Sequence, residues 1–272
     1  MNFECAAVVL SARRYGEGGA VVHLFTEEYG RIAGLVRGGS SRRQAALWQP
    51  GNLILARYAA RLSEQLGQLT GEMVQETAVR LLDRPLQLAL VQAAAELTDS
   101  ALPDREPHPD FFLRTIRDLT AFCVLADPAP VIDYVRWETA LLATLGYGLT
   151  LDSCAVTGAM HGLSYVSPKT GRAVSAEGAG NWVDRLLPLP AYLRPDGGDA
   201  GADDPALWAQ GLALTGHFLS RHLFGARHRP VPASRERLEA RVLRMVEGQG
   251  EGKGEGVSNA VIDRDSVEPQ GA

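Results

Sequence analysis

The 272-residue sequence is poor in cysteine, in lysine and in long apolar runs. Its three cysteines, Cys5, Cys123 and Cys154, lie far apart and form no CxxC pair, so they predict no disulfide framework and favour a reducing cytoplasm. The sequence has no run of about 18 or more apolar residues, so we expect no membrane span. The first residues lack a basic stretch followed by an apolar run, and Glu4 interrupts them, so we expect no signal peptide.

Common catalytic motifs are also missing. The sequence has no GxxxxGK[ST] loop, so we expect no ATP binding. It also has no GxSxG, HExxH or paired Cys/His arrangement that would indicate a hydrolase. Glu17, Glu27 and Glu28 could indicate acid–base chemistry, but no His or Cys at ligand spacing accompanies them. Because Glu27 and Glu28 precede a Tyr-Gly pair, we interpret them as polar residues of a hairpin turn. A hydrolase is therefore the weakest functional alternative, and we expect no enzymatic activity.

Charge is unevenly distributed along the chain. The formal net charge of −5 argues against nucleic acid, but residues 1–62 contain eight arginines and four glutamates. This segment therefore carries +4 and leaves −9 for the remainder. Much of the positive charge lies in the stretch EYGRIAGLVRGGSSRR, residues 28–43. Such an asymmetry indicates an interaction surface.

Residues 3–75 show the pattern of a small β domain. Five apolar runs rich in β-branched and aromatic residues are separated by Tyr-Gly, Gly-Gly and Pro-Gly turn signals. Their number and spacing predict a small antiparallel barrel or a sandwich. A five-stranded barrel of the OB type fits the size of the segment, and an SH3-like barrel is the competing interpretation.

After about residue 78 the apolar spacing becomes helical. Helical patterns cover residues 84–102, 108–126, 129–148, 203–225 and 234–248. A segment rich in Gly and Ser, with a Pro-Lys-Thr-Gly turn, predicts a β-hairpin insertion at about 150–183. The predicted fold is therefore α+β, with an OB-fold over 1–78 and a mainly helical domain over 79–247. Residues 248–272 lack a core pattern and are expected to be disordered.

Several segments, taken in order, resemble the RecO family of bacterial recombination mediators. VLSARRYGEGGAVVHLFTEEYGRIAGLVRGG, a basic loop and LGQLTGE resemble its N-terminal domain, whereas CAVTG, YVSPKTGRAVS and LLPLPAYL resemble its later part. The resemblance covers roughly residues 3–245. It implies a DNA repair and recombination protein of the cytoplasm and nucleoid that binds single- and double-stranded DNA and anneals complementary strands without a cofactor.

The same resemblance implies protein partners. Members of the family work with RecR and help load RecA onto DNA coated by single-stranded DNA-binding protein (SSB). They contact the acidic, apolar C-terminal tail of SSB through the helical domain. Because the +4 charge of the first segment is modest, an alternative stays open, in which the OB domain binds a protein and the chain is an adaptor without direct DNA contact.

An OB barrel that binds single strands needs positive charge along the DNA backbone and flat rings for the bases. The glycines and serines of residues 38–41 would let the backbone approach phosphates closely, and we expect residues 37–43 to be mobile before DNA binds. Candidate stacking rings are Tyr15, Tyr29, Trp48 and Tyr58, of which the last two are more typical of a core. The predicted DNA contacts are Arg13, Arg14, Arg31, Arg37, Arg42, Arg43 and Arg57.

Residues 217–244 form a second basic stretch, with apolar residues interspersed. Taken alone, it is an ordinary amphipathic helix. The resemblance favours a groove for the SSB tail, because an acidic, apolar peptide needs an apolar pocket with a basic rim and arginine binds carboxylates bidentately. The residues predicted to line this groove are Leu219, Arg221, Leu223 and Phe224.

Zinc is the last question that the sequence raises, because some members of the family carry two CxxC pairs in the insertion. This chain keeps only Cys154, and the matching positions hold Thr157, Ser175 and Gly178. His161 alone cannot complete a tetrahedral site. We therefore predict no structural zinc and expect packing to hold the hairpin, with contributions from Tyr165, Val166 and Val174.

Overall fold

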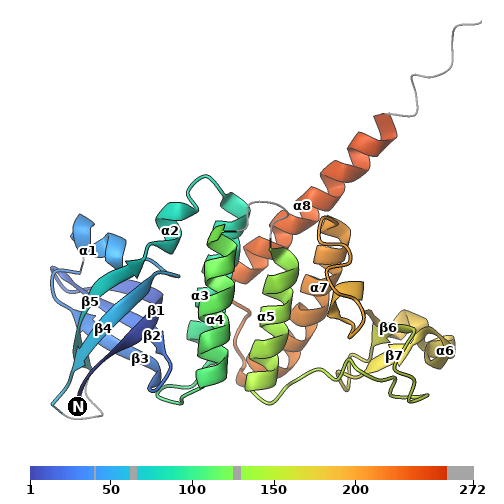
Figure 1. Ribbon diagram of the computed structural model, residues 1–272, viewed down its shortest axis with the longest axis horizontal. Coiled ribbons are helices and arrows are strands. Elements are labelled where there is room, and N and C mark those ends of the chain that lie inside the picture. Colours follow the sequence, from blue (N-terminus) through green and yellow to red (C-terminus); the bar gives the residue numbers. More distant parts are fainter. Residues whose placement is uncertain (40, 62–65, 125–129, 256–272) are drawn as a thin grey trace, which may run out of the picture.

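The computed structural model describes residues 1–39, 41–61, 66–124 and 130–255. A β-barrel stands at one end of the molecule, helices occupy the middle, and a small sheet lies at the other end (Figure 1). This arrangement confirms the predicted α+β class.

The first domain is a closed five-stranded barrel. Its strands follow one another in the order β1-β2-β3-β5-β4, with β1 also paired to β4 and β3 parallel to β5. This closure confirms the predicted barrel of the OB type. The elements are β1 (Asn2–Tyr15), β2 (Gly19–Thr26), β3 (Gly30–Val36), α1 (Arg42–Leu47), β4 (Leu53–Ala59) and β5 (Gly67–Gln75).

The connection between β3 and β4 contains the short helix α1, which we did not predict, and the mobility expected for residues 37–43 stays a prediction. Gly38 adopts a positive φ of 68° in a tight turn, and the Ser41 hydroxyl accepts a hydrogen bond from the Gln44 amide at 3.4 Å as the N-cap of α1. At the other end of α1, Trp48 is 1% exposed and its Nε1 donates to Gln44 Oε1 at 3.2 Å. The short helix therefore forms because its cap and its buried tryptophan fix both ends.

The second domain is built mainly of helices. They are α2 (Thr77–Arg80), α3 (Pro85–Ala101), α4 (Pro109–Val124), α5 (Val131–Thr144), α7 (Pro205–Phe218), η3 (Leu219–Phe224), η4 (Gly225–Arg227) and α8 (Ala233–Glu255). Within the described ranges, none of the helices is long and apolar enough to cross a membrane. α8 continues beyond residue 247, where we expected disorder to begin, and projects past its neighbours (Figure 1). The rest of that predicted disordered segment, residues 256–272, lies outside the described residues.

The insertion contains the predicted hairpin, formed by β6 (Leu163–Val166) and β7 (Ala173–Ser175). A third strand, β8 (Leu187–Pro188), pairs with β6 and extends the small sheet beyond residue 183. A two-residue strand is too short to produce an alternating pattern, so the sequence did not predict it. Short helices complete the insertion: α6 (Ala176–Ala179), η1 (Gly180–Arg185) and η2 (Ala191–Leu193).

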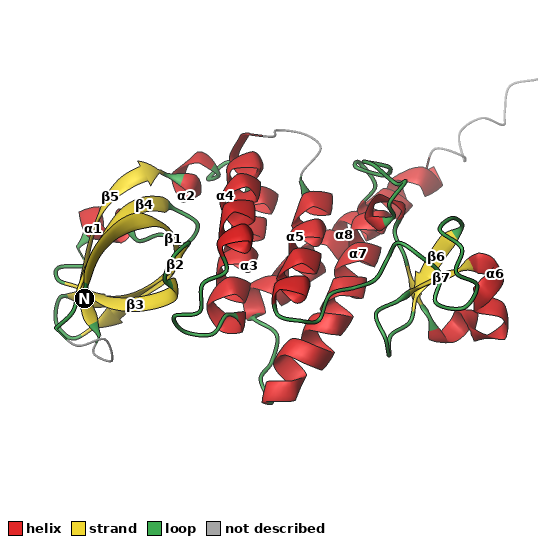
Figure 2. Cartoon of the chain, turned by 60° about the horizontal axis from the view of Figure 1, so that its bottom comes forward, coloured by secondary structure: helices red, strands yellow, loops and turns green. Residues whose placement is uncertain are grey.

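Asp99 on α3 joins the barrel to the helical domain, where α3 and α4 stand next to the barrel wall (Figure 2). Its carboxylate accepts hydrogen bonds from Ser11 Oγ at 2.8 Å, from His23 Nδ1 at 2.6 Å and from Arg31 Nη1 at 2.9 Å. Burial raises the pKa of Asp99, but the hydrogen bonds from these three partners outweigh it and hold the pKa below its ordinary value.

Replacing Asp99 with asparagine is expected to lower the free energy of unfolding by about 2–3 kcal/mol near neutral pH, because the change leaves buried donors without a charged acceptor. The folded pKa of Asp99 is depressed, so its stabilisation is present above the unfolded pKa and is lost as pH falls through the folded pKa. The difference between the wild type and the variant should therefore shrink below about pH 4.

Urea unfolding at neutral and acidic pH measures this difference. Asp203→Asn is the matched control, because Asp203 is exposed and has no hydrogen bond or ion pair among the described residues. A difference between Asp99→Asn and the wild type that stays constant down to about pH 3 would contradict the assigned role of the carboxylate.

Candidate nucleic-acid interface

The register of the barrel brings two basic segments to one end. Arg14 on β1 is opposite Ala20 on β2, and Ala20 is opposite Val36 on β3. The last residues of β1 and the exit from β3 therefore flank the start of β2. Arg13 and Arg14 approach from one side, and Arg37, which follows β3, approaches from the other.

A close packing contact holds the connection after β3 against the same place. A Cβ atom at Gly39 would lie 2.9 Å from the Ala20 Cβ, so only glycine allows the turn to approach β2 this closely. Between the end of β1 and α1 lies a hollow of about 350 Å³, lined in part by Arg13, Arg14, Gly39 and Trp48. We call it the barrel-end groove.

The arginines at this end of the barrel are available to a ligand. Arg13, Arg14 and Arg37 are exposed, and none of them forms an ion pair with a described residue. Arg42 and Arg43 begin α1, which adjoins the groove. The groove therefore combines positive charge with an absence of described carboxylate partners, as a phosphate-binding surface requires.

Only one of the four candidate stacking rings is exposed at the end of the barrel. Tyr15 follows Arg14 at the end of β1 and is 60% exposed. Trp48 and Tyr58 are buried in the barrel core, as we expected. Tyr29 stacks on Phe3, with ring centroids 3.7 Å apart, and the same ring of Phe3 stacks on Tyr58. Base stacking at this end of the barrel is therefore limited to Tyr15 among these rings.

Two predicted DNA contacts have other partners, and this corrects the predicted set. The Arg31 side chain is 18% exposed and forms ion pairs with Asp99 and, at 2.7 Å, with Asp104. Arg57 lies between Glu4 and Glu72 on the outer face of the barrel, and its Nη1 is 2.8 Å from Glu72 Oε1. The Arg31 guanidinium is paired at the contact between the barrel and the helical domain. The charge of Arg57 is compensated by Glu4 and Glu72.

The peptide site predicted at residues 219–224 also requires correction. Leu219, Leu223 and Phe224 are buried in the main core, whereas Arg221 is exposed. The π-helix η3 follows α7 and turns these three apolar side chains inward. They cannot line an open groove, because their surface is already covered by the helical domain.

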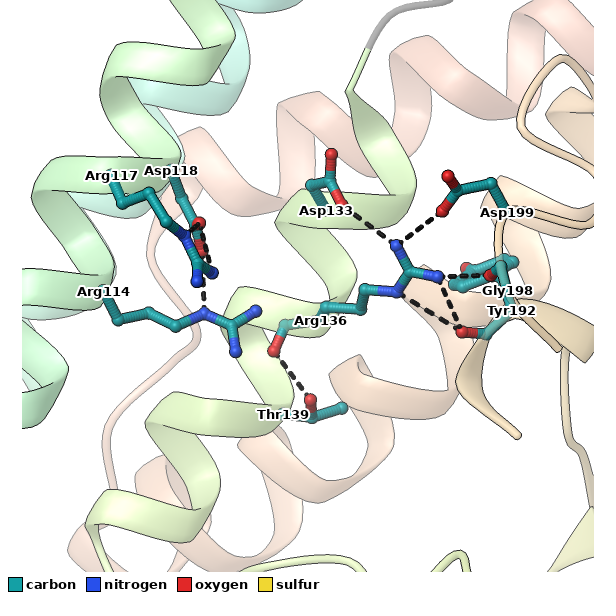
Figure 3. Close-up of polar contacts among 9 residues, drawn as sticks. All are labelled: Arg114, Arg117, Asp118, Asp133, Arg136, Thr139, Tyr192, Gly198 and Asp199. Atoms are coloured by element: carbon teal, nitrogen blue, oxygen red, sulfur yellow. Dashed lines mark hydrogen bonds and ion pairs between the residues drawn. The ribbon is translucent and has the colours of Figure 1, made fainter. Parts of the chain in front are cut away.

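Several other arginines of the helical domain form ion pairs with aspartates. Figure 3 shows Arg136 on α5, whose Nη1 lies 3.1 Å from Asp133 and 3.0 Å from Asp199. The same figure shows Arg114 and Arg117 on α4, which both contact Asp118 at 2.8 Å. These arginines fix the helices and the loop before α7, and their charge is compensated locally.

The first turns of α8 contain a buried ion pair. Arg235 is 1% exposed and its Nε lies 2.6 Å from Oε1 of Glu138, which is fully buried on α5. Thr215 on α7 donates to the same carboxylate, and Arg235 also donates to the Leu212 carbonyl at 2.5 Å. Burial alone would lower the pKa of Arg235, but its neighbours, Glu138 first among them, together have the larger, opposite effect. The net pKa is raised, so the guanidinium stays charged. This network joins α5, α7 and α8.

Three arginines on the side of α8 beside α3 have no such partners among the described residues. Arg237, Arg241 and Arg244 follow one another at helical spacing and form no ion pair with a described residue. They border a hollow of about 300 Å³ between α3 and α8, which we call the α3–α8 groove. Its apolar lining comes from Pro85, Leu88, Ala89 and Ala240. Sequence reasoning missed this groove because α3 and α8 are far apart in the chain.

Cys154 lies at the centre of the insertion. Its Sγ accepts hydrogen bonds from the Ser175 amide at 3.2 Å, from Ser175 Oγ at 3.3 Å and from the Thr157 amide at 3.4 Å. Burial raises the pKa of the thiol, but these hydrogen bonds outweigh it and lower the pKa to about 6. Among the described residues, no group of three or more His, Cys, Asp or Glu could hold a metal ion. The absence of zinc stays a prediction.

Comparisons with known proteins agree in both halves of the chain. The family model described as recombination protein O, N terminal, matches residues 1–76, and the model described as recombination protein O, C terminal, matches residues 82–230. A protein named DNA repair protein RecO from Granulibacter bethesdensis is 48% identical over 252 residues, which cover 92% of this chain and 99% of the relative. One of the same name from Rhodospirillum centenum is 50% identical over 240 residues, covering 88% and 93%.

Proposed function

The chain belongs to the RecO family of DNA repair proteins, and from this premise we propose that it acts without enzymatic turnover by binding DNA at the barrel-end groove. The observation that carries the proposal is a set of three exposed arginines at one end of an OB barrel, none of which forms an ion pair with a described residue: Arg13, Arg14 and Arg37. Arg42 and Arg43 are the first residues of α1, and we propose them as further phosphate contacts.

The chemistry of the groove favours contacts with the DNA backbone. Guanidinium groups neutralise phosphates, and the counterions released make affinity fall with salt. Tyr15 is the single exposed ring among the candidates, so base contacts are few. Bases that are not held by the protein stay accessible to a complementary strand. This division of contacts supports annealing of complementary strands.

Partners complete the proposed function. We infer that the protein acts at the nucleoid with RecR and helps load RecA onto single strands coated by SSB. For the acidic, apolar SSB tail, we place the site in the α3–α8 groove, because its rim of arginines and its apolar lining match that peptide better than the buried residues of η3. Arg221 is exposed, but Leu219, Leu223 and Phe224 are buried and offer no apolar surface beside it.

Strand annealing on DNA coated by SSB tests this function. The full chain is expected to accelerate the pairing of two complementary labelled strands over a reaction without the chain, as measured by loss of donor fluorescence on pairing. An adaptor whose barrel binds only protein would leave the rate unchanged. Annealing at the rate of the reaction without the chain would therefore favour the adaptor and contradict direct action on DNA.

A further inference from the structure

We propose that the α3–α8 groove binds the chain's own acidic segment, residues 256–272, and that this segment competes with acidic partner peptides for the groove. That this competition regulates the binding of partner peptides rests on the proposed function. The binding of the segment to the groove does not.

The groove contains groups that lack partners. Arg237, Arg241 and Arg244 place three positive charges along one face of α8, without an ion pair to a described residue. Ser234, which also lines the groove, is 5% exposed, and its hydroxyl has no hydrogen-bond partner among the described residues. Buried hydroxyls are satisfied by protein groups, ordered water or ligands, so this hydroxyl is open to a hydrogen bond with a bound peptide.

An acidic, apolar peptide fits this chemistry better than nucleic acid. Leu88 and Ala89 pack against the main core and present an aliphatic surface in the groove. No aromatic side chain lines the groove, so it offers no surface for stacking a base. Aliphatic lining with an arginine rim is the arrangement that accepts a peptide with alternating apolar and acidic residues.

Residues 256–272 have the matching composition. Asp263, Asp265 and Glu268 carry three negative charges against the single positive charge of Arg264. Val267 lies between two of these carboxylates in sequence. An extended chain could therefore direct acidic side chains to the arginines and an apolar side chain to the aliphatic lining.

The segment can also reach the groove. Arg244 and Arg237 lie about 16 Å and 27 Å before Glu255 along α8, at about 1.5 Å per residue. Asp265 and Glu268 can extend about 33 Å and 43 Å from Glu255, at about 3.3 Å per residue. The reach exceeds the distance in each case, so the segment can turn back antiparallel to α8. A short tether gives an effective concentration in the millimolar range, so weak contacts are sufficient.

A cysteine pair in the full chain tests the contact. Ala240→Cys places a thiol in the groove, and Val267→Cys places one in the segment. Thiol–disulfide equilibrium against glutathione then measures their effective concentration. The control combines Val267→Cys with Leu243→Cys, because Leu243 is exposed on the same helix, nearer to the segment in sequence, but outside the groove.

We expect the Ala240 pair to show an effective concentration at least about tenfold above that of the control pair. Arg241→Glu with Arg244→Glu in the same chain should lower it to the control value. Equal values for the two pairs, or no effect of the charge reversals, would overturn the proposal. Disulfide-linked dimers in place of an internal disulfide would assign the groove to the segment of a second copy and would also overturn it.

A labelled peptide of the acidic SSB tail separates this proposal from the proposed function. The full chain should bind the peptide about tenfold more weakly than a variant with Asp263→Asn, Asp265→Asn and Glu268→Gln, because the acidic segment no longer competes. If both chains bind the peptide equally, the competition is wrong and the proposed peptide site stands. If neither binds it while the cysteine pair forms its disulfide, the SSB-tail site is wrong and the internal contact stands.

Discussion

Replacing Arg235 with alanine is expected to lower the free energy of unfolding by about 3–5 kcal/mol, because the change leaves the buried carboxylate of Glu138 without its charged partner. The loss extends beyond one ion pair. Glu138 also accepts from Thr215, and Arg235 also donates to the Leu212 carbonyl and to Glu239. Equilibrium unfolding in urea, followed by circular dichroism, measures the difference.

Two variants control this prediction. Arg241→Ala removes an arginine from the same helix that has no ion pair among the described residues, so we expect a change below about 0.5 kcal/mol. Replacing both Glu138 and Arg235 with leucine removes the two buried charges together and should recover much of the loss. An Arg235→Ala variant as stable as Arg241→Ala would contradict the role of the network in holding α5, α7 and α8 together.

Reversing the charge of Arg13, Arg14 and Arg37 to glutamate is expected to weaken binding of single-stranded DNA by at least about 100-fold at moderate salt, or about 3 kcal/mol. The change removes three phosphate contacts and adds three repulsive charges. Because all three side chains are exposed and form no ion pair with a described residue, the fold should be unaffected. Fluorescence anisotropy with a labelled strand measures the affinity.

The matched control carries the same change of net charge outside the barrel. Arg172 and Arg185 lie in the insertion, at the opposite end of the molecule from the barrel (Figure 1), Arg221 lies in η3, and all three are exposed. Their reversal to glutamate should weaken DNA binding by less than about threefold, through the long-range field alone. Equal losses in the two triple variants would show that DNA responds to net charge and that the barrel-end groove has no special part in binding.

The sequence predicted those features that depend on neighbouring residues. The strand runs of the barrel alternate locally and end at glycine turns, so their number and their positions along the chain could be inferred, and Trp48 and Tyr58 were expected in the core. The sequence did not predict α1. A six-residue helix whose ends are fixed by Ser41 and Trp48 is too short to show a helical spacing of apolar residues that would distinguish it from a loop.

Features that depend on distant residues could not be predicted. The ion pair between Arg31 and Asp99 could not be predicted, because the two residues are remote in sequence. The apolar face at residues 219–224 was visible, but an amphipathic pattern does not show whether that face is covered by the rest of the protein. The α3–α8 groove exists only because α3 and α8 pack together, and no local pattern contains that contact.

The salt dependence of DNA binding tests the central claim most directly. For the wild-type chain and the Arg13/Arg14/Arg37 triple reversal, the slope of log K against log salt is measured on the same single strand. If these arginines neutralise phosphates, the slope of the variant should be shallower by about 2, since each neutralised phosphate on a single strand contributes about 0.7. The Arg172/Arg185/Arg221 control should keep the wild-type slope. Identical slopes for all three chains would contradict phosphate binding at the barrel-end groove.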